Sequence, residues 1–249
     1  MLNVAIVSVS YNTKELTALL LWSLHRVLEA GKVNLLVVDN ASADGSLNLL
    51  RRARDAGLCD LIENDTNIGH GRALNLAMNT AQVTDADRVW VLDSDCVITH
   101  PDALAAPLTA YPDAAVIGEA HWDKWHQQMR FELHSLLLDA RAIAAAGTSP
   151  FNDDGDPAWG LLQSAEQAGL ETASFPFTAD GYLIHLGRGS LAAVAAAGKT
   201  DNPLYSWAIE HHEPHFGGIE KAQQRHQRVL EQFRAEVGPD LDLAGALLG

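Results

Sequence analysis

Carboxylates follow two of the short hydrophobic runs of this sequence, at the point where each run ends. Asp39 follows residues 33–38, and Asp93 and Asp95 follow residues 88–92. Carboxylate oxygens are hard ligands that suit Mg²⁺ or Mn²⁺, and these ions bridge to phosphate oxygens. Asp93 and Asp95 are one residue apart, so at a strand end both can address the same ligand. A solvated surface turn is the alternative, and the position after a buried run favours the metal site.

A glycine-containing loop, Asn67–Arg72, is a candidate for binding phosphate. Its glycines permit close approach of the backbone, and the amino end of the helix that follows attracts anions. Arg72 can pair with a phosphate group. The spacing is not that of a dinucleotide-binding fingerprint, because no third glycine follows. A tight turn with an arginine that faces the helix is the alternative.

Alternating strands and helices are expected to bring these candidates together. The predicted strands are 3–9, 33–38, 61–63 and 88–92, and the predicted helices are 14–30, 46–56 and 70–81. This alternation predicts an α/β fold with a doubly wound, mostly parallel sheet and helices on both faces. Ligands bind at the edge formed by the carboxyl ends of the strands. The side chains expected there are those of Ser10, Tyr11, Asn12, Asp39, Asp93 and Asp95. Repulsion among the carboxylates favours a bound cation.

The second half of the chain is less regular. Strands are predicted at 114–118 and 183–186, and helices at 158–168 and 220–237. The last helix is polar and charged on most faces, which favours a solvated lid or an oligomer contact over a core helix. The segment 147–156, rich in Gly, Ser, Pro and Asp, is the best candidate for a mobile loop.

The composition is that of a globular chain long enough to bury a substantial core. The 249 residues are 47% hydrophobic, and 17 basic against 32 acidic residues give a net charge of −15. This acidity argues against binding to nucleic acid or to anionic membranes. The apolar stretches are too short to span a bilayer. Two cysteines make no disulfide framework, and no signal peptide opens the sequence, so a reduced, cytoplasmic setting is expected.

Four segments, in this order, resemble the family 2 glycosyltransferases, which have the GT-A fold. They are Val7–Asn12, Val37–Ser46, Asn67–Asn75 and Asp93–Asp95. The resemblance implies a single GT-A domain over residues 1–249. Its parts would be a nucleotide-sugar-binding half at 1–100, an acceptor-binding half at 101–217 and a C-terminal helix at 218–249. The implied reaction moves a sugar from a nucleotide-diphosphate sugar to an acceptor hydroxyl with inversion, and depends on a metal.

The resemblance also implies a role for each matching position. Asp39 would read the donor base, Asp95 would bind Mn²⁺ or Mg²⁺, and Asp93 would approach the metal or the ribose. The metal would stabilise the leaving nucleoside diphosphate. The other donor-binding candidates are Ser10, Tyr11, Asn12, Asn67, Gly69, Arg72, Ser94 and Arg188.

The general base and a third metal ligand are expected in the second half. The base candidates are Asp156, then Asp154 and Asp153, although Asp156 before a proline is equally a helix N-cap. The family's usual acidic pair is missing here. His185 matches by position a late histidine that completes the metal site in several members of this fold. A histidine hydrogen-bonded at a strand end is the alternative for it.

Two further groups of side chains are weaker candidates. The segment 210–215 holds three histidines, but Pro214 interrupts any helix, so a solvated loop is favoured over a ligand set. Trp122, Trp125 and His126 are expected to follow the strand at 114–118, where they would stack against an acceptor or pack in the core.

Two other functions stay open. A sugar nucleotidyltransferase needs similar carboxylates but usually also a glycine-rich basic loop, whereas Ser8–Lys14 has no glycine and one lysine. A non-catalytic nucleotide-binding module of the receiver type needs about half this length. The expected donor is a UDP-, GDP- or dTDP-sugar. The short acceptor half favours a small-molecule acceptor over a polymer, and a homodimer is an open option.

Overall fold

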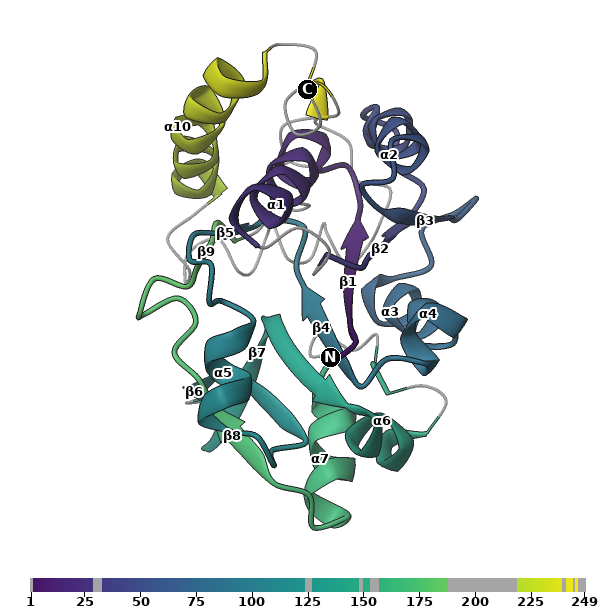
Figure 1. Cartoon of the computed structure of the whole chain (residues 1–249), viewed down its shortest axis with the longest axis vertical. Helices are drawn as coiled ribbons and strands as arrows, with labels where there is room; N and C mark the ends of the chain where they lie inside the picture. Colours follow the sequence, from purple (N-terminus) through teal and green to yellow (C-terminus); the bar gives the residue numbers. More distant parts are fainter. Residues whose placement is uncertain are drawn as a thin grey trace.

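A seven-stranded sheet runs through the molecule, in the order β3-β2-β1-β4-β7-β6-β8, and a two-stranded sheet, β5-β9, lies beside the first helix (Figure 1). The computed structural model describes residues 2–28, 33–123, 127–147, 150–152, 157–187, 219–238, 241–243 and 245. The large sheet is mixed but mostly parallel and carries helices, as the sequence predicts. The division into halves at 1–100, 101–217 and 218–249 stays a prediction.

The first four strands form the parallel part of the large sheet. Their bounds are β1 (Val4–Ser10), β2 (Leu35–Asp39), β3 (Asp60–Glu63) and β4 (Arg88–Leu92). β1 lies between β2 and β4, and all three are buried along their whole length. Continuous hydrophobic runs are typical of strands that are covered on both faces. The predicted strands are therefore confirmed, with bounds that shift by one or two residues.

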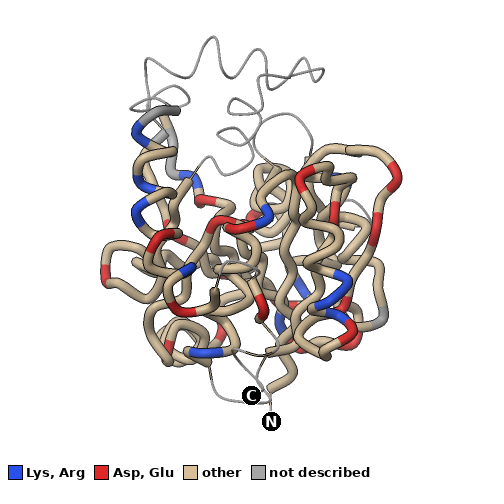
Figure 2. The backbone as a smooth tube through the Cα atoms, turned by 90° about the horizontal axis from the view of Figure 1, so that it is seen from above, with Lys and Arg blue, Asp and Glu red and all other residues tan. Residues whose placement is uncertain are grey.

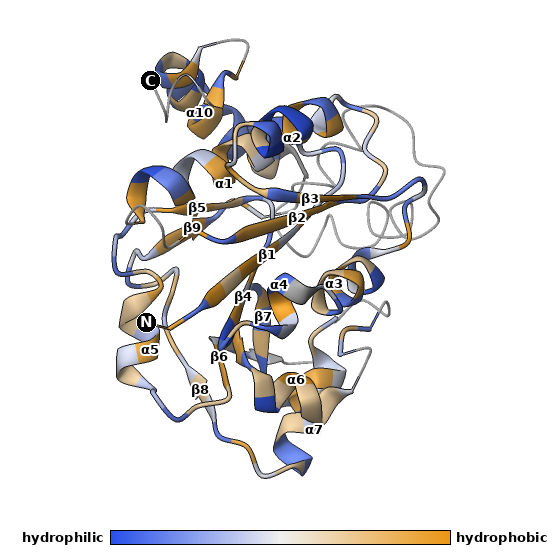
Figure 3. Ribbon diagram, turned by 45° about the vertical axis from the view of Figure 1, so that its right-hand side comes forward, coloured by the Kyte–Doolittle hydropathy of each residue, from blue (hydrophilic) through white to orange (hydrophobic). Residues whose placement is uncertain are grey.

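Helices cover both faces of this sheet. One face carries α1 (Lys14–Val27), α2 (Ser46–Asp55), α5 (Ala105–Ala110) and α10 (Ile219–Val237). The other carries α3 (His70–Met78), α4 (Ala81–Thr84), α6 (Ala140–Ala146) and α7 (Trp159–Gln167). Successive side chains of a strand point to opposite faces. Accordingly Ile6 joins the first core, while Ala5 and Val7 join the second. The hydrophobic character of β1 and β2 is seen along their ribbons in Figure 3.

A long antiparallel strand completes the sheet and was not predicted. β7 (Gln128–Asp139) pairs antiparallel with both β4 and β6 (Val116–Asp123), and β8 (Thr172–Ser174) extends the sheet beyond β6. The strand predicted at 114–118 is only the first part of β6. The helix predicted at 70–81 is confirmed at its start, but it ends at Met78, and a separate turn of helix, α4, follows.

The small sheet and the last helix pack on α1. β5 (Cys96–Ile98) pairs antiparallel with β9 (Leu183–His185), and β5 lies against α1. On α10, Leu230 and Phe233 are buried, and the Phe233 ring meets the edge of Trp22 at 5.7 Å between centroids. The prediction of a solvated lid for this helix was wrong, because its few apolar residues fall on one face that covers α1. An oligomer contact stays a prediction.

The surface is acidic and the described helices are too polar or too short to cross a membrane. Figure 2 shows acidic residues spread over many loops and helices of the described chain. Cys59 and Cys96 are both buried and unpaired, as expected of two cysteines that form no disulfide framework.

Candidate functional site

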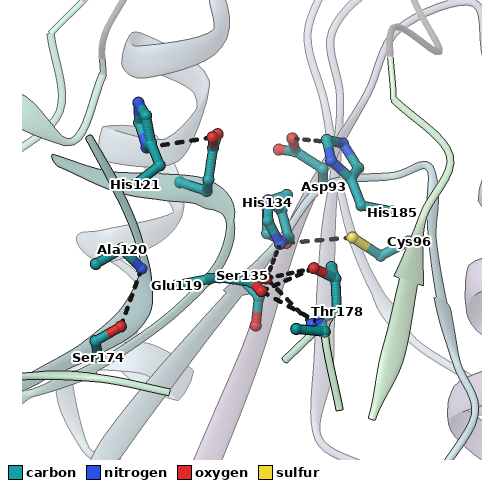
Figure 4. A network of polar contacts seen from close by, with 12 residues as sticks. Asp93, Cys96, Glu119, Ala120, His121, His134, Ser135, Ser174, Thr178 and His185 are labelled. Carbon is teal, nitrogen blue, oxygen red and sulfur yellow. Dashed lines mark hydrogen bonds and ion pairs between the residues drawn. The ribbon is translucent and has the colours of Figure 1, made fainter. Parts of the chain in front are cut away.

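Two carboxylates and one imidazole come together at the carboxyl edge of the parallel strands. One ligand atom each from Asp93, Asp95 and His185 lies within 4.8 Å of the others. The His185 Nε2 atom is 3.3 Å from Asp95 Oδ1 and 3.7 Å from Asp93 Oδ2, and Figure 4 shows His185 beside Asp93. His70, at the start of α3, places its Nε2 atom 3.8 Å from Asp93 Oδ1.

Backbone hydrogen bonds fix the segments that carry these three side chains. The turn after β4 is anchored where Asp93 N–H donates to the carbonyl of His134 on β7, at 3.1 Å. His185 is the last residue of β9 and lies opposite Cys96 in β5. The next N–H, that of Leu186, donates to the carbonyl of Asp95 at 3.0 Å. Two segments that are far apart in the sequence are thus held side by side.

The electrostatics of this group suit a cation. Burial lowers the pKa of His185, but the hydrogen bond to Asp95 and the charges of Asp95 and Asp93 outweigh burial and raise that pKa to about 9. The proton on His185 thus partly balances the two carboxylates. Asp93 Oδ1 is buried without a hydrogen-bond partner. Two carboxylates, one with an unpartnered oxygen, and an imidazole fit the ligand preferences of Mn²⁺, and the carboxylates also suit Mg²⁺.

His134, which was not predicted from the sequence, stacks its ring against that of His185. The rings of His134 and His185 stack with centroids 4.4 Å apart and 16° between their planes. His134 Nε2 is 3.3 Å from Glu119 Oε2 (Figure 4). Burial, followed by the charge of His185, lowers the pKa of His134. The signal available in the sequence was the alternation of polar and apolar residues from Gln128 to His134, which predicts a half-buried strand.

Asp39 forms a second polar centre on the same edge. Its side chain is fully buried at the end of β2, opposite Ser10 of β1. Asp39 Oδ2 accepts the N–H of Ser42 at 3.0 Å, whereas Oδ1 is buried without a hydrogen-bond partner. Burial raises the pKa of this carboxyl, against the lowering effect of the Ser42 bonds. An unpartnered buried oxygen of this kind is suited to accept a hydrogen bond from a ligand.

Hydroxyl groups connect the end of β1 with the turn that carries the metal-site carboxylates. Ser10 Oγ lies 3.0 Å from Thr17 Oγ1, and Thr13 Oγ1 lies 3.2 Å from Ser94 Oγ. β1 is flanked by β2 on one side and β4 on the other. Asp39 and the Asp93–Asp95 turn therefore adjoin the same strand from opposite sides.

The loops after β1 and β2 are tied to each other. Asn12 adopts a positive φ of 53°, where asparagine is one of the few side chains tolerated. Its N–H donates to Ser42 Oγ at 3.0 Å, and its Oδ1 accepts the N–H of Ala43 at 2.7 Å. Asp44 accepts the N–H groups of both Lys14 and Ser46, so it joins the starts of α1 and α2. Asn12 therefore holds the loops after β1 and β2 together. Tyr11, beside it, is half-buried.

The glycine-containing loop is held by Asn40, which lies within the segment Val37–Ser46 and was given no role of its own from the sequence. Asn40 is buried, and its Nδ2 donates to Asn67 Oδ1 and the carbonyl of Gly69. Its Oδ1 accepts from Ile68 N–H and Asn64 Nδ2. Gly69 has a φ of 95°, which favours glycine, and begins α3. Arg72 is exposed on α3.

Several predicted site residues lie outside the described residues. These are Asp153, Asp154, Asp156, Arg188, Trp125, His126 and the histidines of 210–215. Trp122 is described, and its predicted place after the strand was wrong: it lies within β6, with 52% of its surface exposed. Core packing is therefore excluded for Trp122.

The sequence matches the family model described as glycosyl transferase family 2 over residues 5–156. The chain belongs to glycosyl transferase family 2. It is therefore a glycosyltransferase that uses a nucleotide-sugar donor, rather than a nucleotidyltransferase or a binding module. The match includes all four segments on which the resemblance rested, and Asp93 and Asp95 lie within it.

Solved glycosyltransferase structures share the fold. A mannosyltransferase from Pyrobaculum calidifontis, in complex with GDP-Man and Mn²⁺, superposes with a TM-score of 0.57 at 19% identity, covering 99% of this chain and 78% of that one. Glucosyl-3-phosphoglycerate synthase from Mycobacterium tuberculosis, in complex with phosphoglyceric acid, gives 0.53 at 17% identity, covering 80% and 81%. TarS 1–349 from S. aureus gives 0.53 at 16% identity, covering 87% and 72%. No curated protein sequence matches this chain significantly.

Proposed function

We propose that this chain transfers a sugar from a nucleotide-diphosphate sugar to a hydroxyl of a small-molecule acceptor, with inversion, and that it depends on Mn²⁺ or Mg²⁺. The observation that carries the proposal is the group Asp93, Asp95 and His185, within 4.8 Å, on the edge that also holds the unpartnered oxygen of Asp39. A cation site and a hydrogen-bond acceptor on one edge suit the two ends of a nucleoside diphosphate.

The residues at the Asp39 end bind and orient the nucleotide. Asp39 Oδ1 accepts an N–H of the base, which relieves the cost of a buried oxygen without a partner. The segment Ser10–Asn12 and the loop with Asn67 and Gly69 line the base and ribose. Arg72, exposed at the start of α3, pairs with phosphate.

The residues at the other end hold the diphosphate through the cation. Asp93, Asp95 and His185 supply the ligand atoms, and Ser94 lies between the carboxylates. When bound, the cation supplies positive charge that stabilises the leaving nucleoside diphosphate. Asp156, or Asp154 or Asp153, removes the proton from the acceptor hydroxyl, and Arg188 contacts the diphosphate. These four residues are proposed from the family resemblance alone.

A donor screen tests the proposal. The protein is incubated with UDP-, GDP- and dTDP-sugars, each with Mn²⁺, with Mg²⁺ or with EDTA, and release of nucleoside diphosphate is measured. We expect the sugar nucleotides of one base to be hydrolysed slowly when metal is present. The Asp95→Ala variant should release no more nucleoside diphosphate with metal than with EDTA. No release and no binding by any donor, with or without metal, would refute the proposal. Proton NMR of the transferred sugar then reports whether the anomeric configuration is inverted.

A further inference from the structure

The side chain of Glu119 connects three segments next to the metal group, namely β6, β7 and the turn at residues 178–179. On β6, it accepts the Nε2 proton of His134 at 3.3 Å and the N–H of Thr178 at 3.1 Å. It also accepts the Thr178 hydroxyl at 2.8 Å (Figure 4) and the N–H of Ala179 at 3.4 Å. Its side chain is only 16% exposed, so these donors replace most of the water that the carboxylate would otherwise bind. Glu119 therefore fixes β7 and the turn at 178–179 relative to β6.

A bulge of three residues in β7 contains His134, whose ring lies beside the metal group. Gly118 pairs with Leu136 and Glu119 pairs with Glu132, so residues 133–135 of β7 have no partner in β6. On the other side of β7, the carbonyl of His134 accepts Asp93 N–H next to the pairing with β4, and the ring of His134 stacks on that of His185. Bulges that redirect side chains are common next to active sites.

Only one side-chain bond sets the plane of the His134 ring. A carboxylate accepts and does not donate, so the bond to Glu119 places a proton on Nε2. His134 Nδ1 is buried and has no hydrogen-bond partner. The ring of His185 stacks on this plane with 16° between them, so the orientation of one ring is passed to the other.

The turn held by Glu119 also sets the strand that carries His185. Residues Tyr182 and Leu183, at the start of β9, both donate to the carbonyl of Phe177, directly before Thr178. Glu119 thus acts on His185 by two routes, through the backbone of the turn and through the His134 ring.

We propose that Glu119 and His134 are positioning residues that hold the His185 imidazole in the orientation in which it binds the metal. The inference rests on the proposed function, since it concerns the same cation site. Neither residue supplies a ligand atom to the group of Asp93, Asp95 and His185. Residues that orient a metal-binding histidine typically change metal affinity about 10–100-fold when they are removed.

The test measures Mn²⁺ affinity of the full chain without donor, from the electron paramagnetic resonance signal of free Mn²⁺. We expect Glu119→Ala and His134→Ala each to weaken Mn²⁺ binding about 10–100-fold. The double variant is expected to bind about as weakly as Glu119→Ala alone, because Glu119→Ala already removes the bond that orients the His134 ring. Glu119→Gln keeps an acceptor for His134 and Thr178 and should stay within about threefold of the wild type.

Controls separate this inference from the proposed function and from loss of folding. His25→Ala removes an imidazole hydrogen bond elsewhere in the fold, to the carbonyl of Leu58 after α2, and should leave Mn²⁺ affinity unchanged. Thermal unfolding identifies variants that do not fold. If Glu119→Ala does not fold, Thr178→Val removes one donor from an exposed turn and should weaken binding about threefold.

The outcomes are distinct. Wild-type affinity in folded Glu119→Ala and His134→Ala, or effects of the two that add fully in the double variant, would overturn the positioning role while leaving the metal site intact. Equal affinity of wild type and Asp95→Ala would instead overturn the metal site itself, and the positioning role with it.

Discussion

Replacing Asp39 with asparagine should weaken nucleotide binding and stabilise the free protein. The carboxylate is fully buried, has one unpartnered oxygen and has a pKa raised chiefly by burial. The substitution removes the buried charge but leaves one polar atom without a partner. We therefore expect a gain of about 1 kcal/mol in the free energy of unfolding at pH 7. For a chain of this size that corresponds to a rise in Tm of about 2–4 °C.

The expected loss in binding follows from the bond that Asp39 Oδ1 is proposed to accept. The amide of the Asp39→Asn variant can present an N–H₂ group in place of this acceptor, so a hydrogen bond to a charged group, about 1.5–3 kcal/mol, is lost. The Kd for the nucleoside diphosphate should rise roughly 10–150-fold in isothermal titration calorimetry with Mn²⁺. The nucleotide used is the one that the donor screen identifies.

The pH dependence of Tm tests whether the ionised Asp39 carboxyl destabilises the fold. An acid whose pKa is raised by folding is better accommodated when protonated, so it destabilises the fold once the pH exceeds its unfolded pKa of about 3.9. The Tm difference between Asp39→Asn and wild type should therefore be smallest below about pH 4. It should grow as the pH rises through the raised pKa of Asp39, and then level off.

A matched buried aspartate supplies the control. Asp139 is 6% exposed, but its oxygens accept from Ala142 N–H at 3.0 Å and Arg141 Nε at 2.6 Å. Asp139→Asn should lower stability and leave nucleotide binding unchanged, the opposite pattern to Asp39→Asn. If Asp39→Asn lowers Tm as Asp139→Asn does, and binds nucleotide normally, the reasoning about Asp39 is wrong.

Two further predictions concern the support of the site. Asn40→Ala removes four hydrogen bonds to the loop at 64–69 and should cost about 2–5 kcal/mol in the free energy of unfolding, measured by urea denaturation. A cost as small as that of Asn64→Ala, which loses one of the four, would contradict this. Arg234→Ala breaks a half-exposed ion pair with Glu15 between α10 and α1 and should cost no more than about 1 kcal/mol, less at high salt. A larger cost that persists in about 1 M NaCl would show that the side chain contributes by packing instead.

The parallel half of the fold could be predicted because each of its strands is marked by a local sequence pattern. The strand runs ending at Ser10, Asp39 and Leu92 are buried on both faces, and each is a continuous apolar segment. The rule that ligands bind at the carboxyl edge then placed Asp39 near the Asp93–Asp95 turn without knowledge of side-chain contacts. His185 joined the group as the resemblance implied, and its ligand role stays a prediction.

The strands of the second half were harder to predict because their structure depends on pairing between segments that are distant in the sequence. β7 alternates polar and apolar residues from Gln128 to His134 and then continues with three leucines, 136–138, since it passes from the site into the sheet between β4 and β6. The bulge at residues 133–135, and with it the position of His134, is set by the register against β6. No single segment of sequence specifies that register.

The last helix, α10, contacts the segment that carries His185, although the described part of the helix supplies no residue to the metal group. Arg225 donates to the carbonyl of Leu186, and His226 Nε2 lies 2.8 Å from the carbonyl of Gly187. Both contacts fall on the two residues that directly follow His185. A survey of variants limited to side chains around the cation would leave out Arg225 and His226. Changes at these two positions of α10 can nevertheless loosen the peptide that holds His185 in place.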